Sequence, residues 1–125
     1  MTQQHSKFKL FVGHPTEENP LGGLSQKVTD FVRSAGVAAK SIGTEYLEGK
    51  KSLVVTLGYR DDEPTYPVRL HCVKLAGPGQ SGLDNLAVLE TQMAEAAQEL
   101  SGIICHELFI TDDGRFYMVF MIQSN

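Results

Sequence analysis

Residues 103–123 read Ile103-Ile104-Cys105-His106-Glu107-Leu108-Phe109-Ile110-Thr111, then Asp112-Asp113-Gly114, then Arg115-Phe116-Tyr117-Met118-Val119-Phe120-Met121-Ile122-Gln123. Both flanking runs are rich in β-branched and aromatic residues, which favours β-strands. A short Asp-Gly turn between two such runs is typical of a hairpin, because glycine tolerates the positive φ that tight turns require. The sequence therefore predicts a β-hairpin over this stretch.

The second strand of this hairpin is apolar on both of its faces. Successive residues of a strand point to opposite sides of a sheet, so a strand with one face in water should alternate between apolar and polar residues. Here one face would carry Phe116, Met118, Phe120 and Ile122, and the other Tyr117, Val119 and Met121. We therefore expect both sides of this strand to be covered.

The preceding chain contains the same kinds of element. Strand-like runs cover residues 7–12, 38–48, 52–60 and 67–75. An apolar stripe at helical spacing predicts a helix over 24–35 that ends at Gly36 and starts either at Asn19-Pro20 or at Ser25. A second such stripe predicts a helix over 83–100, which Gly102 ends. The resulting element order is βαββ followed by βαββ.

The two halves of the chain resemble each other. Thr44-Glu45-Tyr46-Leu47 stands in the first half where His106-Glu107-Leu108-Phe109 stands in the second, 62 positions later. Each half also has a glycine-rich loop before its helix and a glycine after it. We interpret this as a degenerate duplication with repeats at 7–60 and 66–123, the alternative being chance similarity between common α+β elements.

These observations predict a single α+β domain over residues 7–125, preceded by a flexible leader at 1–6. We expect a two-layer sandwich in which about six mostly antiparallel strands carry two helices on one face. Helices on one face leave the other face of the apolar strands uncovered, so either the sheet curls round on itself or a second copy covers it. We expect the second arrangement, a homodimer in which sheet packs on sheet.

Composition limits the classes of partner and compartment. The formal net charge is −4, which disfavours nucleic acid, and the chain has no apolar run long enough to span a membrane. Its two cysteines, Cys72 and Cys105, each lie within an apolar run, which is typical of reduced thiols in the cytoplasm. We expect a cytoplasmic homodimer with a protein or small-molecule partner, and neither a membrane nor a nucleic-acid partner.

Four residues are weak candidates for catalysis: His71, Cys105, His106 and Glu107. A thiolate at Cys105 could pair with His71 if the crossover between the two strands brings them together. The alternative is that both cysteines have only a structural role, as small residues of the hydrophobic core. Adjacent residues of a strand face opposite ways, so a zinc site built from both His-Cys steps has poor geometry. We therefore expect no metal and no cofactor.

Two glycine-rich loops lead into the predicted helices, where free N–H groups favour anions. Their candidate ligand-binding residues are Gly22, Gly23 and Ser25 in the first loop and Gly79, Ser81 and Gly82 in the second. Neither loop matches a P-loop or a dinucleotide-binding pattern. The simpler interpretation is that both loops are flexible connections between a strand and a helix.

No motif in the chain is specific enough to indicate a family. The leading hypothesis is a small homodimeric binding or interaction domain that is not an enzyme. One alternative is a small enzyme with a His/Cys/Glu site on the sheet. A second alternative is phosphate or nucleotide binding at the glycine-rich loops.

Overall fold

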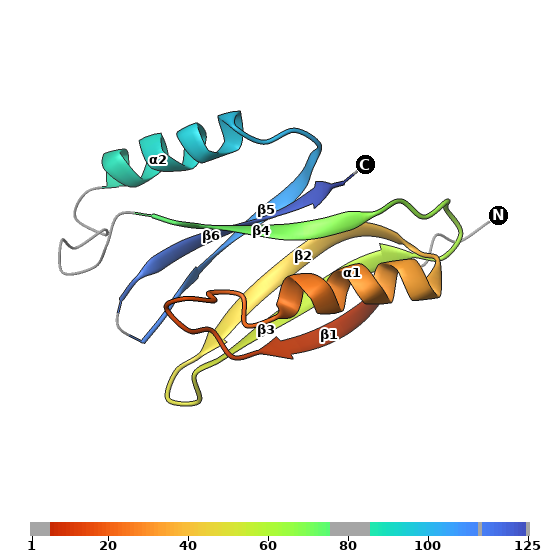
Figure 1. The fold of residues 1–125 in the computed structure, drawn as a ribbon, viewed down its shortest axis with the longest axis horizontal. Helices are drawn as coiled ribbons and strands as arrows, with labels where there is room; N and C mark the ends of the chain where they lie inside the picture. Colours follow the sequence, from red (N-terminus) through yellow and green to blue (C-terminus); the bar gives the residue numbers. More distant parts are fainter. Residues whose placement is uncertain (1–5, 76–85, 113, 125) are drawn as a thin grey trace.

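A computed structural model describes residues 6–75, 86–112 and 114–124 (Figure 1). It contains six strands and two helices in the predicted βαββ-βαββ order, which confirms the α+β class. In chain order the elements are β1 (Lys7–Gly13), α1 (Leu24–Ala35), β2 (Ala38–Leu47), β3 (Ser52–Arg60), β4 (Val68–Lys74), α2 (Leu86–Gln98), β5 (Ile103–Ile110) and β6 (Phe116–Gln123).

The six strands form two three-stranded sheets, each made by one half of the chain. The strand orders are β1-β3-β2 and β4-β6-β5, and all neighbours are antiparallel. In each half the third strand therefore lies between the first two, which run parallel to each other and are joined by the helix. The hairpin predicted at residues 103–123 is present as β5 and β6.

The two sheets also share an irregularity in register. A bulge interrupts β2 between Ala39 and Ser41, and another interrupts β5 between Ile103 and Cys105, at the corresponding place in each sheet. A duplicated unit would show this agreement. The β2 and β5 bulges lie 64 positions apart in the sequence. The strand register therefore gives an offset of 64 between the two halves, whereas the sequence comparison predicted 62.

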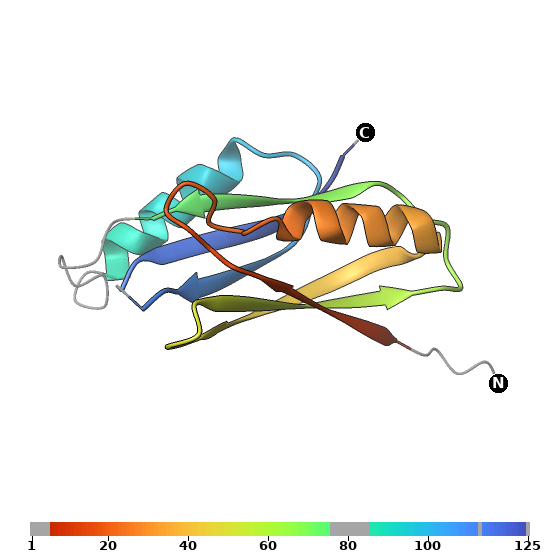
Figure 2. The ribbon, with the colours of Figure 1, turned by 60° about the horizontal axis from the view of Figure 1, so that its bottom comes forward.

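The sheets touch at one edge and are separated by a helix at the other. β2 lies against β5, whereas α1 lies between the two sheets and contacts both β4 and β1 (Figure 2). The second helix, α2, lies on the outer side of the β4-β6-β5 sheet (Figure 1). The layers are therefore α2, the second sheet, α1 as a wedge, and the first sheet.

Both faces of β6 are buried within the chain, as its sequence predicts. Tyr117, Val119 and Met121 join the core between the sheets with residues of α1, including Val28 and Val32. The alternate residues lie under α2, in a second core of Leu75, Leu89, Phe116, Met118, Phe120 and Ile122. Each large apolar side chain buried in this way contributes about 1.5–3 kcal/mol to stability.

The position of the helices differs from the single helical face that the sequence suggested. The two halves stack, so α1 enters the central core while α2 covers the outside of the second sheet. Periodicity shows that a helix has an apolar stripe, but it does not show which sheet face receives that stripe. As a result β6 needs no second copy to cover it.

The ends of α1 follow from backbone geometry. Gly36 has φ 65°, and its N–H donates to Val32 O at 3.0 Å, which confirms the predicted helix end. The helix begins at Leu24, and the preceding Gly23 is also left-handed. Ser25 lies in the first turn, where its hydroxyl oxygen accepts a hydrogen bond from Leu70 N at 3.0 Å. It therefore ties α1 to β4.

The second helix, α2, ends at Gln98, two residues before the end that the sequence predicted at residue 100. The predicted start at residues 83–85 lies outside the described residues. Neither α1 nor α2 is long and apolar enough to cross a lipid bilayer.

Side chains, rather than a continuous strand ladder, join β2 to β5. The Thr44 hydroxyl donates to Leu108 O at 2.9 Å, and Thr44 N donates to the Glu107 carboxylate at 3.3 Å. Both bonds use backbone groups at the edges of the two sheets. We call this contact the β2–β5 seam.

We expect Thr44→Val to weaken the seam, because the valine keeps the shape of the side chain but loses the bond to Leu108 O. The free energy of unfolding in urea should fall by about 1–2 kcal/mol. Thr56→Val on the neighbouring strand is the control, and it should change stability by less than about 0.5 kcal/mol. Equal effects of the two substitutions would show that the seam bond contributes nothing.

Candidate functional site

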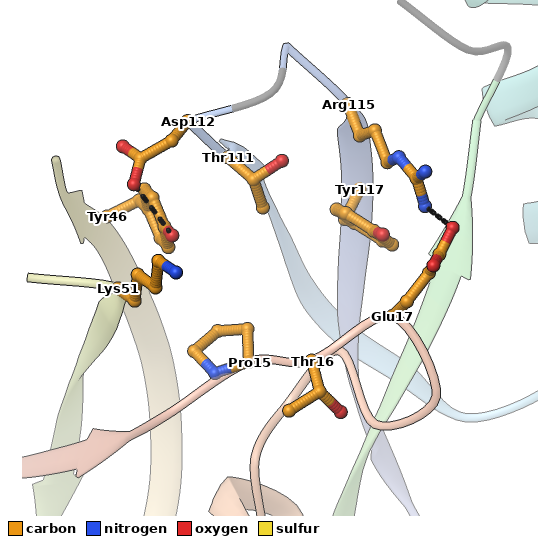
Figure 3. Close-up of a pocket in the computed structure, with 9 residues that line it drawn as sticks. All are labelled: Pro15, Thr16, Glu17, Tyr46, Lys51, Thr111, Asp112, Arg115 and Tyr117. Carbon is orange, nitrogen blue, oxygen red and sulfur yellow. Dashed lines mark hydrogen bonds and ion pairs between the residues drawn. The ribbon is translucent and has the colours of Figure 1, made fainter. Parts of the chain in front are cut away.

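A cavity of about 270 Å³ lies at one end of the molecule, where three connecting segments meet (Figure 3). These segments are residues 15–17 before α1, the β2–β3 hairpin and the β5–β6 turn. The first two come from one half of the chain and the third from the other. Its side chains are mostly polar, and they include Tyr46, Lys51, Thr111, Arg115 and Tyr117.

Asp112 holds the two hairpins together above this cavity. Its carboxylate accepts hydrogen bonds from the Tyr46 hydroxyl at 3.4 Å and from Gly49 N at 3.4 Å. The β5–β6 turn that carries it is closed by Gly114 N donating to Thr111 O at 2.9 Å, and Gly114 has φ 79°. The predicted turn thus provides the residue that connects the two sheets at this end.

The opposite wall is held by an ion pair between Arg115 and Glu17 (Figure 3). Glu17 lies in the segment before α1, so the pair joins that segment to β6. Beneath the cavity, the ring of Phe109 stacks on Tyr46 at 6.5 Å and on Tyr117 at 5.1 Å between centroids. The walls are therefore fixed by contacts that exist without a ligand.

Lys51 is the cation of the cavity that has no partner among the described residues. No hydrogen bond or ion pair joins its ammonium group to them, and Figure 3 shows the side chain directed into the open space. Its backbone has φ 50°, which makes it the one non-glycine with positive φ in the described chain. This conformation is costly for a residue with a Cβ and is concentrated at functional sites.

The two candidate histidines lie on the face of the second sheet that α2 partly covers. His71 on β4 and His106 on β5 both pair with Phe120, which separates them. His71 also lines a groove of about 270 Å³ together with Glu95 of α2 and with Glu99, which follows the helix. The structure therefore places both histidines on one face but does not bring them into contact.

The cysteines lie on the opposite face, in the central core. Cys72 pairs with Val119 and Cys105 with Met121, and both thiols are free. Burial raises the pKa of Cys72 to about 12 and also raises the pKa of Cys105. Because His71 points to the other face of the sheet, it cannot act as a base for Cys105.

Glu107, the remaining catalytic candidate, takes part in the β2–β5 seam. Its carboxylate accepts from Thr44 N, and it lies near the Cα of Gly43 on the same edge. Among the described residues, no group of three or more His, Cys, Asp or Glu side chains could hold a metal ion.

The first glycine-rich loop has a structural explanation. Gly22 has φ 58°, and a Cβ there would come within 2.5 Å of His14 N, so only glycine fits. Gly23 precedes α1 with φ 87°. Gly79, Ser81 and Gly82 of the second loop lie outside the described residues.

Sequence reasoning did not find the cavity, because its residues come from three separate segments and match no motif. A lysine at a hairpin position that favours glycine is the one local signal, and it becomes visible only once the turn geometry is known. Comparisons of the chain with models of protein families, with curated proteins and with solved structures found no match.

We expect neither cysteine to react with a disulfide reagent such as DTNB in the folded protein near pH 8. A thiol reacts as its thiolate, and the raised pKa values keep both thiols protonated. Both should react within seconds to minutes in denaturing urea. Rapid labelling of either thiol in the native state, rising steeply near neutral pH, would restore the nucleophile hypothesis.

Proposed function

We propose that this protein is a homodimeric binding domain of the cytoplasm, and that two copies pack through the outer face of the β1-β3-β2 sheet. The outer face is defined by the strand register, and it consists of Phe8, Leu10, Val12, Ser41, Gly43, Glu45, Val54, Thr56 and Gly58. The two free thiols fit a reducing compartment.

The observation that carries the proposal is an exposed apolar ridge along β1. The exposed fractions are 66% for Phe8, 64% for Leu10 and 44% for Val12. Three large apolar side chains in a row on one strand are unusual on a surface in contact with water, and such patches mark interaction sites. On the corresponding strand of the second sheet, β4, none of the described residues is an exposed large apolar side chain.

The occupant we propose is a second copy of the chain. The ridge lies at one margin of the sheet, Thr56 and Gly58 lie beside it on β3, and Gly43 lies on β2 at the other margin. A two-fold axis through the face would set each ridge into the shallow area of the partner. Glu45 is the one charged residue of the nine, so two copies would meet with little repulsion.

We expect the protein to elute as a dimer at micromolar concentration, and Leu10→Asp to make it a monomer. A two-fold interface would contain the new carboxylate twice, which should weaken association by about a hundredfold or more. Molar mass from light scattering measures the effect, and circular dichroism verifies that the variant is folded.

The control is Leu86→Asp, which replaces another exposed leucine, 55% exposed, on α2. This variant should remain a dimer. A wild-type monomer at about 100 μM, or equal dissociation of the two variants, would contradict the proposal.

A further inference from the structure

The cavity at the hairpin end is lined by a lysine, Lys51, whose ammonium group makes no ion pair or hydrogen bond with the described residues. Both acids that line it are already engaged: Glu17 is paired with Arg115, and Asp112 accepts hydrogen bonds from Tyr46 and Gly49. The ammonium group of Lys51 points into the space between these walls (Figure 3). Lys51 is exposed, but its side chain lines the cavity and has no partner among the described residues, so its ammonium group is available to an anionic ligand.

Hydroxyl groups surround the same space. Tyr46, Thr111 and Tyr117 all line the cavity, and each hydroxyl can both donate and accept a hydrogen bond. A volume of about 270 Å³ lies just below the usual range for ligand pockets, so the occupant must be small. The lining therefore suits a molecule that has several hydroxyl groups and one negative charge.

We propose that this cavity binds a small hydroxylated anion. Its carboxylate or phosphate group pairs with Lys51, and its hydroxyl groups exchange hydrogen bonds with Tyr46, Thr111 and Tyr117. Carboxylate and phosphate share the chemistry that Lys51 recognises, and the binding experiment distinguishes them. The site lies away from the outer face, so the inference does not depend on dimerisation.

The backbone of Lys51 gives independent support. Its φ of 50° would suit glycine or asparagine, whereas a residue with a longer side chain is strained there. Lys50, the adjacent hairpin residue, is exposed like Lys51 but does not have a positive φ. A strained lysine directed into a cavity is expected when its ammonium group has a role in binding.

Three compounds with the same six-carbon hydroxylated chain provide the test: gluconate, sorbitol 6-phosphate and neutral sorbitol. Titration calorimetry and thermal melting of the full chain should show binding of at least one anion at about 10 mM, and none of sorbitol. The anion that binds more tightly identifies the charged group. Absence of binding by both anions, or equal binding of sorbitol, would overturn the proposal.

Two matched variants locate the site. Lys51→Met should weaken binding of the preferred anion about 10- to 100-fold, because it removes a charged hydrogen-bond donor. Lys50→Met removes the same charge one residue away and should change affinity by less than about twofold. Equal losses in the two variants would show that the effect is only one of net charge, and would overturn the assignment.

A third variant separates binding from folding. Lys51→Gly should abolish binding and yet raise the melting temperature by about 2–6 °C, because glycine removes the strain. Lys50→Gly should not raise the melting temperature. If Lys51→Gly lowered the melting temperature, or if it bound the anion like the wild type, the role assigned to Lys51 would be wrong.

Discussion

Burial of β6 on both faces is the constraint on which the rest of this structure depends. Its odd-numbered residues need a cover that α2 cannot provide, and the first half of the chain supplies it through α1 and the inner side of the first sheet. Each βαββ half has one side that carries its helix and one bare side. Packing the helix side of the first half against the bare side of the second closes the central core.

The cavity is a product of this stacking. Its walls come from hairpins of both halves, and Asp112 and Arg115 of the second half bind groups of the first. A ligand held between Lys51 and Tyr117 would contact both halves at once. Its binding would therefore stabilise their association, because it binds only the assembled form.

Sequence reasoning was most successful where the signal was local. The terminal hairpin, the end of α1 at Gly36 and the element order all follow from turn glycines and periodicity, and the structure confirms them. The face on which each helix packs was not predictable, because an apolar stripe does not specify its partner. Candidate residues such as Cys105 and His71 lie on strands that β6 separates and on opposite faces of the sheet, which only the register determines. Lys51 belongs to no sequence motif, so the sequence did not indicate a role for it in binding.

A stack of two units in the same orientation has two different ends. The bare end is the apolar outer face, while the far end is α2, whose two charged residues, Glu90 and Glu95, are both acidic. Joining bare end to far end would repeat without limit and build a fibre. In the dimer that we propose, bare end meets bare end, and growth would stop at two chains.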